Sequence, residues 1–451
     1  MNINTVKILG WLDEAARWSL YALMAAIPFS NALVSIFSVL TIAFFLFHWM
    51  LKKKFGGLFS ETGGRGFLLL WPVLKWLIVA YVVWNLVSVV ASIEAAQSLR
   101  AFFTKMLKNV VLLSAIIAHV RRKEHVLALL GALLAGACVA CVDGLIQWQT
   151  GTDLFRGVKL SVEHSGDRVS GPFNHPNDLG GFLLVAGILL IAFLQAKFSF
   201  IQFLAGRFRS QPSFLVKARY PWILMGVFFL VMACLGLTFS RSAWFGFFAG
   251  AVFFGCANHR IKLWFVMAFM ISALIFVPLF QQKRNKGKLI NLPQKEFSFR
   301  NAVSFDYWKE VFELSSSGRA QFWKDAWRIA SDHPLTGSGL NTYSDVLKTY
   351  PGSTKGWYAH NCYLQMAAEI GFVGVSLFIL IFGSFYAYMF RFIARFQDPK
   401  WRTLCIGISA ALFGFLLHCM FDTALYSVQL GPVAWILMAV AIAVVRTETC
   451  S

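Results

Sequence analysis

Charged residues are scarce in this chain of 451 residues, and acidic residues are scarcer than basic ones. Only 14% of the residues are charged and 58% are hydrophobic, whereas about 25% charged residues is usual for a soluble domain. The hydrophobic residues form uncharged runs long enough to cross a bilayer as helices, for which roughly 17–25 residues are needed. This pattern excludes a soluble globular protein and predicts an all-α, polytopic membrane helix bundle.

The sequence also lacks the spacings that predict disulfides or metal sites. Its eight cysteines lie in or beside apolar runs, where cysteine behaves as a small hydrophobic residue. It contains no Asp-x-Asp pair of the kind that holds a divalent metal. We therefore expect no metal and no cofactor, and we expect membrane lipids rather than nucleic acid beside the basic residues.

Hydropathy predicts twelve membrane-spanning helices. The first apolar run follows Asp13, Glu14 and Arg17 and has no small-residue cleavage site, which favours a retained helix over a signal peptide. The expected spans are residues 16–30, 31–50, 67–91, 105–119, 126–147, 179–196, 220–238, 242–257, 263–281, 361–390, 403–421 and 427–445.

Basic residues gather in alternate linkers, which places those linkers and both termini in the cytoplasm by the positive-inside bias. The two longest loops, 148–178 and 282–360, then lie outside. We expect three regions: helices one to nine with the outer loop 148–178 in residues 1–281, a large periplasmic loop in 282–360, and helices ten to twelve in 361–451. The sequence gives no indication of oligomeric state.

The large outer loop predicts two short amphipathic helices. Ser317 is the expected N-cap of a helix over Arg319 to Ser331, and Pro334 is its expected stop. A glycine-rich turn at 336–339 leads to a second helix over Asn341 to Thr349.

Four polar motifs lie on the outer side of this topology, each close to a predicted membrane surface. They read GDRVSGPFNHPN (166–177), TFSRS (238–242), SGR (317–319) and YAHN (358–361). With SGRAQFWKDAW, HPLTGSGLNTY and AHNCYLQMAAEIGFVG around them, they resemble the O-antigen ligase and polymerase superfamily of membrane glycosyltransferases. Among its families the chain is most similar to the O-antigen ligases.

This resemblance implies a bundle of the GT-C-like type and a metal-independent, inverting transfer of a glycan from undecaprenyl diphosphate to a lipid A-core sugar. It implies a periplasmic active site on a bacterial inner membrane, with a histidine base and arginines that bind the diphosphate. Those catalytic roles fall on His360, Arg319, Arg241 and Arg168. The expected substrate-binding residues are His175, Asn174, Tyr358, Asn361, Ser317, Trp323 and Gly339.

The chemistry of the residue types agrees with these roles. An arginine binds phosphate oxygens with two parallel hydrogen bonds and stays charged at any relevant pH. An imidazole accepts a proton near neutral pH. Asn361 is a plausible N-cap, and the positive end of its helix would favour the neutral, basic form of His360.

Simpler interpretations remain open for several residues. Arginines near a membrane surface often only contact headgroups, and His175 could simply cap the sixth span. The glycine-rich turn at 337–339 could be a turn alone. Asp143, Glu369 and the pair His418 and Asp422 are expensive in lipid, and we expect structural pairing for them.

Other functions also remain open. An O-antigen polymerase uses the same donor to extend a second lipid-linked chain, and a protein O-oligosaccharyltransferase uses a hydroxyl side chain as acceptor. A flippase or transporter should show related halves and charges at the membrane midplane, whereas the unusual residues here lie in outer loops.

Overall fold

The computed structural model describes residues 3–55, 72–160, 168–197, 220–258, 305–354 and 358–449. These residues are helical apart from loops, which include an isolated β-bridge between Thr152 and Lys159. The helices are α1 (Ile3–Ala26), α2 (Asn31–Phe55), α4 (Pro72–Val90), α5 (Ala95–Ala101), α6 (Lys108–His119), α7 (Lys123–Thr150), α8 (Pro176–Ala196), α10 (Tyr220–Leu237), α11 (Arg241–Asn258), α14 (Phe305–Asp332), α15 (Tyr343–Leu347), α16 (Cys362–Ile393), α17 (Pro399–His418) and α18 (Gly431–Thr449). A π-helical segment, η1 (Phe102–Leu107), joins α5 to α6, and η2 (Ala424–Tyr426) is a 3₁₀ turn.

Eight helices in the described part of the chain are long and apolar enough to cross a membrane: α2, α4, the run α5–η1–α6, α7, α8, α16, α17 and α18. The prediction of an all-α, multi-pass membrane protein is thus confirmed. The ninth expected span, 263–281, lies outside the described residues.

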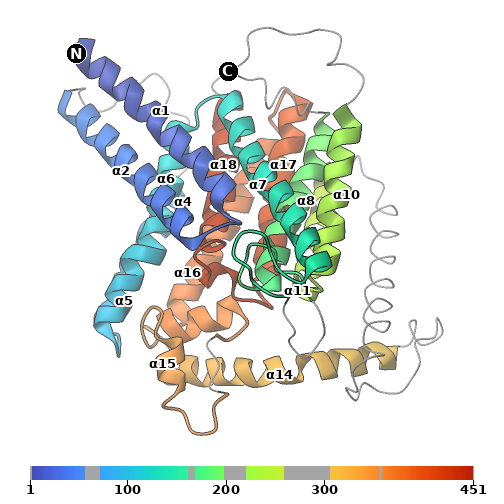
Figure 1. The fold of residues 1–451 in the computed structure, drawn as a ribbon. Helices are drawn as coiled ribbons and strands as arrows, with labels where there is room; N and C mark the ends of the chain where they lie inside the picture. The colour runs from blue at the N-terminus through green and yellow to red at the C-terminus, as the bar shows by residue number, and fades with distance from the viewer. Residues whose placement is uncertain are drawn as a thin grey trace.

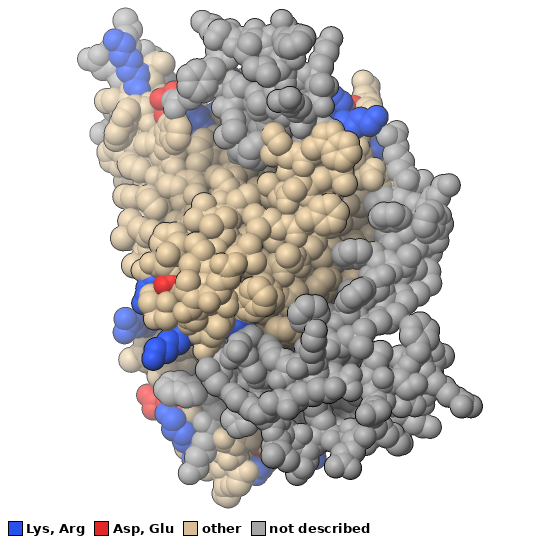
Figure 2. Space-filling view, turned by 45° about the vertical axis from the view of Figure 1, so that its right-hand side comes forward, with Lys and Arg blue, Asp and Glu red and all other residues tan. Residues whose placement is uncertain are grey.

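Large apolar side chains on the outer faces of α2 and α4 are exposed, including Ile36, Val39, Phe47, Val73, Trp76 and Val83. An apolar surface of this extent suits lipid and not water. Figure 2 agrees: on the face it draws, the described charged residues gather toward the two ends, with an uncharged surface between them.

Helices α8, α17 and α18 are the most enclosed spans, and α17 packs against α8, α11 and α18. The contact between α11 and α17 depends on small residues. A Cβ on Gly246 would lie 2.5 Å from the carbonyl oxygen of Gly414, and a Cβ on Gly414 would lie 2.3 Å from that of Gly246. Close backbone approach of this kind is how membrane helices gain packing energy without a hydrophobic drive between them.

Three helix predictions need correction. The expected N-cap Ser317 lies inside α14, which begins at Phe305, because serine and glycine cost a helix only about 0.5–1 kcal/mol each and do not by themselves stop it. The span expected over 105–119 begins at Ala95. Helix α1 is Ile3–Ala26, so the helix expected over 16–30 begins before Asp13 and Arg17, which form an ion pair within it.

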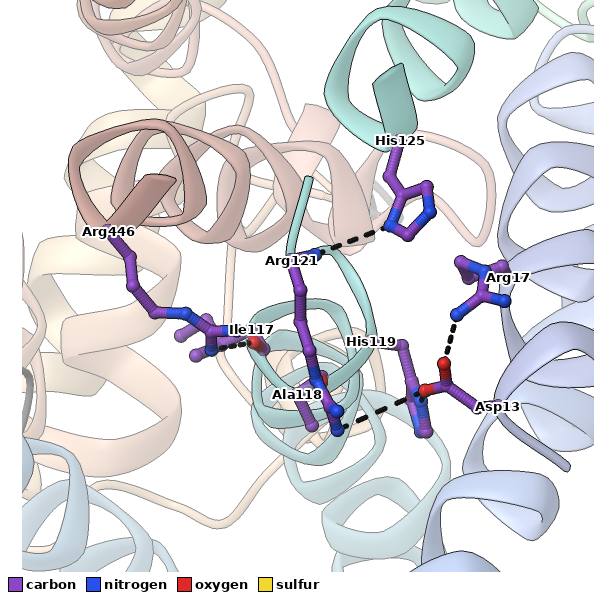
Figure 3. Close-up of polar contacts among 8 residues, drawn as sticks. All are labelled: Asp13, Arg17, Ile117, Ala118, His119, Arg121, His125 and Arg446. Carbon is purple, nitrogen blue, oxygen red and sulfur yellow. Dashed lines mark hydrogen bonds and ion pairs between the residues drawn. The ribbon is translucent and has the colours of Figure 1, made fainter. Parts of the chain in front are cut away.

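The two termini lie at one end of the bundle, and α14 lies across the other end (Figure 1). At the end with the termini, Asp13 on α1 pairs with Arg17 and shares a hydrogen bond of 2.6 Å with Nδ1 of His119 (Figure 3). Arg446 of α18 donates to the carbonyl oxygen of Ile117 at 2.8 Å. These contacts tie α1, α6 and α18 together.

Candidate active site

Arg168 joins the start of α8 to the turn between α10 and α11. Its Nε donates to the carbonyl oxygen of Thr238 at 2.9 Å, and its Nη2 donates to Oδ1 of Asn177 at 2.5 Å. The neighbouring Val169 N donates to the carbonyl oxygen of Leu237 at 3.1 Å. The described part of the motif 166–177, from Arg168 on, therefore meets the motif 238–242, and Arg168 helps to hold the two together.

His175 is the N-cap of α8. Its Nδ1 accepts a hydrogen bond from Asn177 N at 3.2 Å, and Pro176 follows as the first helical residue. Asn174 Oδ1 accepts from Nη1 of Arg156 at 2.7 Å. The structure therefore shows His175 as a helix cap, which was the simpler interpretation. His175 and Asn174 both make local structural contacts.

Arg241 and Arg319 come together from different parts of the chain. Arg241 is the first residue of α11, and Arg319 lies on α14, close enough for the two positive charges to repel each other. The positive charge of Arg319 also acts on His418 at the end of α17. Among the described residues neither arginine forms an ion pair with a carboxylate. Because the N-terminal N–H groups of α11 add positive potential, this is a favourable place for an anion.

The loop after α17 brings a carboxylate to the same place. Asp422 is buried, its Oδ2 lacks a hydrogen-bond partner among the described atoms, and its charge opposes that of Asp178 in the first turn of α8. The charge of Asp422 acts on His418, but the two side chains share no hydrogen bond in the described structure. The reason is that α17 ends at His418, so Asp422 does not follow it by one helical turn.

His360 lies beside α14 in a constrained conformation. Its φ of +50° lies in the left-handed region, and its ring stands edge-on to Phe322 with centroids 5.3 Å apart. Asn361 is the N-cap of α16, as expected, and its Oδ1 accepts from Tyr363 N at 2.9 Å and Leu364 N at 3.0 Å.

Aromatic residues connect α14 to the surrounding loops. Trp323 packs on Phe421 with ring centroids 6.1 Å apart, and its buried Nε1 has no hydrogen-bond partner among the described atoms. Arg319, Phe322 and Trp323 are three and four residues apart, so they share one face of α14. The helix face that contacts His360 and Phe421 is thus the face that carries Arg319.

Tyr358 packs against a second tyrosine and feels the charges of carboxylates on two helices. Its ring packs against Tyr426 with centroids 6.4 Å apart. Burial raises the pKa of Tyr358, and the negative charges of Glu369 and Asp178 raise that pKa further. Tyr358 therefore stays protonated at neutral pH and is able to donate a hydrogen bond.

The glycine-rich turn closes a break in α16. At Gly371 the backbone leaves the helix, with φ 72° and ψ 175°. Ser338 N and Gly339 N donate to the carbonyl oxygens of Ala368 and Glu369 at 2.9 and 2.8 Å. A carbonyl freed by a helix break needs such a partner in a membrane protein, so Gly339 has a structural task here, and a Cβ on it would lie 1.9 Å from Oγ of Ser92.

Sequence reasoning did not single out Gln365. This residue is 2% exposed and lies one turn before Glu369, to which its Nε2 donates at 3.1 Å. Its Oε1 accepts from Ala359 N at 3.2 Å. The sequence did carry a signal for this pair: an amide four residues before an acid, inside an apolar span that follows the motif 358–361.

Comparison with known proteins gives one match to a family model and one weak relative. Residues 225–379 match the family model described as O-antigen ligase, a stretch that includes Arg241, Arg319 and His360 but not Arg168. The "Exopolysaccharide production protein ExoQ" of Rhizobium meliloti (strain 1021) is 27% identical over 107 residues, which are 22% of this chain and 24% of that protein. The match thus spans about a quarter of the length of that relative. The predicted resemblance is confirmed: residues 225–379 match the O-antigen ligase model, and ExoQ is a weak relative.

Proposed function

We propose that this protein is an inverting, metal-independent glycosyltransferase of the bacterial inner membrane. It moves an O-antigen glycan from undecaprenyl diphosphate to a sugar of the lipid A-core, on the periplasmic face. The proposal includes twelve spans in a GT-C-like bundle. It puts α14 on the periplasmic side and both termini in the cytoplasm.

The observation that carries the proposal is the approach of Arg241 and Arg319, two arginines without a carboxylate partner among the described residues, beside the N-terminus of α11. Holding two like charges together costs free energy in the absence of an anion. A diphosphate would neutralise them, and Arg168, which is tied to the neighbouring turn, would add a third positive charge. During transfer the bond from the anomeric carbon to the diphosphate oxygen breaks, and the arginines stabilise the charge that grows on that oxygen.

His360 is the proposed base. It takes the proton of the acceptor hydroxyl, whose oxygen attacks the anomeric carbon from the face opposite the diphosphate and so inverts its configuration. Trp323 with its free indole N–H, Tyr358 and Asn361 border the same region and are the proposed substrate contacts. Ser317 and Asn174 remain weaker candidates for this role, as do His175 and Gly339, which have structural tasks.

A purified-protein assay tests the proposal. Undecaprenyl diphosphate-linked glycan and lipid A-core are supplied, and the products are separated by gel and identified by mass. We expect glycosylated lipid A-core with wild type, its loss with His360→Ala and Arg319→Ala, and its retention with the controls His333→Ala and Arg328→Ala in the same region. Full transfer by His360→Ala would exclude the proposed base.

A polymerase is the second candidate, and the name of the relative favours it, since that protein is described as acting in exopolysaccharide production. The same assay separates the two candidates. If only longer undecaprenyl-linked chains form and lipid A-core stays unmodified, the chain is a polymerase and the ligase proposal is wrong.

A further inference from the structure

A chain of hydrogen bonds runs from the interior of the bundle to the peptide before His360. Lys105 Nζ donates to Oδ1 of Asn341, and Asn341 N donates to Oε2 of Glu369 at 2.8 Å. Gln365 Nε2 donates to the other carboxylate oxygen, Oε1, at 3.1 Å. Gln365 Oε1 then accepts from Ala359 N at 3.2 Å, so the chain ends one residue before His360.

The members of this chain have little freedom to rearrange. Gln365 and Glu369 are 2% and 1% exposed, and a buried polar group that loses its partner costs about 1–3 kcal/mol. A carboxylate only accepts hydrogen bonds, so Glu369 requires that the NH₂ group of Gln365 faces it. The amide oxygen of Gln365 is thereby directed at Ala359 N, which can only donate.

His360, which follows the last residue of this hydrogen-bond chain, needs such an anchor. His360 has φ +50°, a region that costs a residue with a side chain on the order of 1 kcal/mol or more. It persists because the backbone is fixed on both sides: Ala359 N is bound by Gln365, and Asn361 caps α16. The cap alone fixes only the residues that follow His360.

We propose that Gln365, oriented by Glu369, is a positioning residue that holds the His360 imidazole in its productive place. This inference rests on the proposed function, in which His360 is the base. Gln365 touches neither substrate nor reacting atoms and acts only through the backbone at Ala359. A misplacement of a catalytic group by about 1 Å costs on the order of 100-fold in rate, so the anchor is worth a measurable part of kcat.

The test is Gln365→Met, which keeps the length of the side chain and removes both hydrogen bonds. We expect kcat to fall roughly 10- to 100-fold, with the KM for the undecaprenyl diphosphate donor unchanged because the arginines are untouched. Gln429→Met is the matched control: Gln429 is also 2% exposed and donates to the carbonyl oxygen of Ile27 at 2.9 Å, without a link to His360. It should retain the wild-type kcat.

A double-mutant cycle separates positioning from general stability. If Gln365 acts through His360, adding Gln365→Met to His360→Ala causes no further loss of the residual rate. An additive loss, an equal loss in Gln429→Met, or a Gln365→Met kcat within twofold of wild type would overturn the inference. If His360→Ala is inactive while Gln365→Met is fully active, this inference fails and the proposed function stands. If wild type transfers no glycan, the proposed function itself fails.

A variant in which the two side chains are exchanged tests the proposal if Gln365→Met does not fold. Gln365→Glu alone sets two carboxylates against each other and should lower kcat. The double variant Gln365→Glu with Glu369→Gln restores the chain in reverse, because the new amide donates to the new carboxylate, which still accepts from Ala359 N. Recovery of kcat in the double variant supports the proposal, and a folded double variant without recovery contradicts it.

Discussion

The break in α16 at Gly371 offers a sharp test of how the site is assembled. The φ and ψ of 72° and 175° belong to a region that is essentially restricted to glycine, and other residues there cost roughly 1–3 kcal/mol. A Cβ at this position would also lie 1.7 Å from the carbonyl oxygen of Leu335 and 2.9 Å from that of Pro334. Gly371→Ala therefore forces the backbone of residues 334–335 away from α16.

That displacement removes several hydrogen bonds at once. Phe372 N donates to the carbonyl oxygen of Pro334 at 2.8 Å, and the bonds from Ser338 N and Gly339 N to α16 depend on the same approach. With about 1 kcal/mol for each of the three bonds and the backbone strain added, we expect a loss of roughly 4–6 kcal/mol.

Gly383→Ala is the matched control in the same helix. Gly383 is exposed, and nothing lies within 4 Å of a Cβ placed on it. In a regular helix the alanine should stabilise by roughly 0.5–1 kcal/mol. Thermal unfolding of the two purified variants, followed by tryptophan fluorescence, measures the difference. Equal melting temperatures for Gly371→Ala and Gly383→Ala would refute the reasoning.

Three further predictions follow from single residues. Arg319→Ala should lower transfer on the order of 100- to 1000-fold, yet its melting temperature should not fall below that of wild type, because Arg319 and Arg241 repel each other; a clear drop in melting temperature would contradict this. His360→Gly should have a free energy of unfolding about 1 kcal/mol higher than His360→Ala, and a higher melting temperature, since glycine accepts φ +50° without strain. Transfer is lost in both variants. Burial would raise the pKa of Asp13, but the hydrogen bond with His119 and the charges of Arg121, His119 and Arg17 outweigh it and hold that pKa below its ordinary value of 3.8. A lowered pKa stabilises the fold above the ordinary value, so wild type should be more stable than Asp13→Asn at neutral pH, and the difference should shrink as the pH falls below about 3.8; a constant difference would show that the ion pair is not its source.

The membrane helices and their caps could be predicted because their signals are local. The span expected over 179–196 is α8, Pro176–Ala196, and the expected cap at Asn361 is present. An uncharged apolar run, a capping side chain and a proline in the first turn can each be recognised in a short, continuous stretch of sequence. The four polar motifs were likewise visible as short runs, and their assignment to one end of the bundle followed from counting spans.

The break in α16 could not be predicted, because its cause lies elsewhere in the chain. A glycine inside an apolar run is usually tolerated in a helix, and Gly383 in α16 is regular. Gly371 differs only because the turn at 336–339 supplies donors for the carbonyls that the break releases. No local pattern specifies partners that tertiary packing brings together. Gln365 is a different case, because its partners, Ala359 N and a carboxylate one turn away, lie near it in the sequence.

Helix α14 sets where the arginine lies relative to the imidazole. Its Phe322 packs on His360, before the break, and its Trp327 packs on Phe372, after the break, with ring centroids 5.6 Å apart. Because these two contacts lie five residues apart on α14, a slide of α14 by one turn, about 5.4 Å, would break both and carry Arg319 away from Arg241. Arg319 and His360, the proposed base, thus stay in register as long as α16 is bent at Gly371. Straightening α16 should separate these two residues even where both side chains are intact.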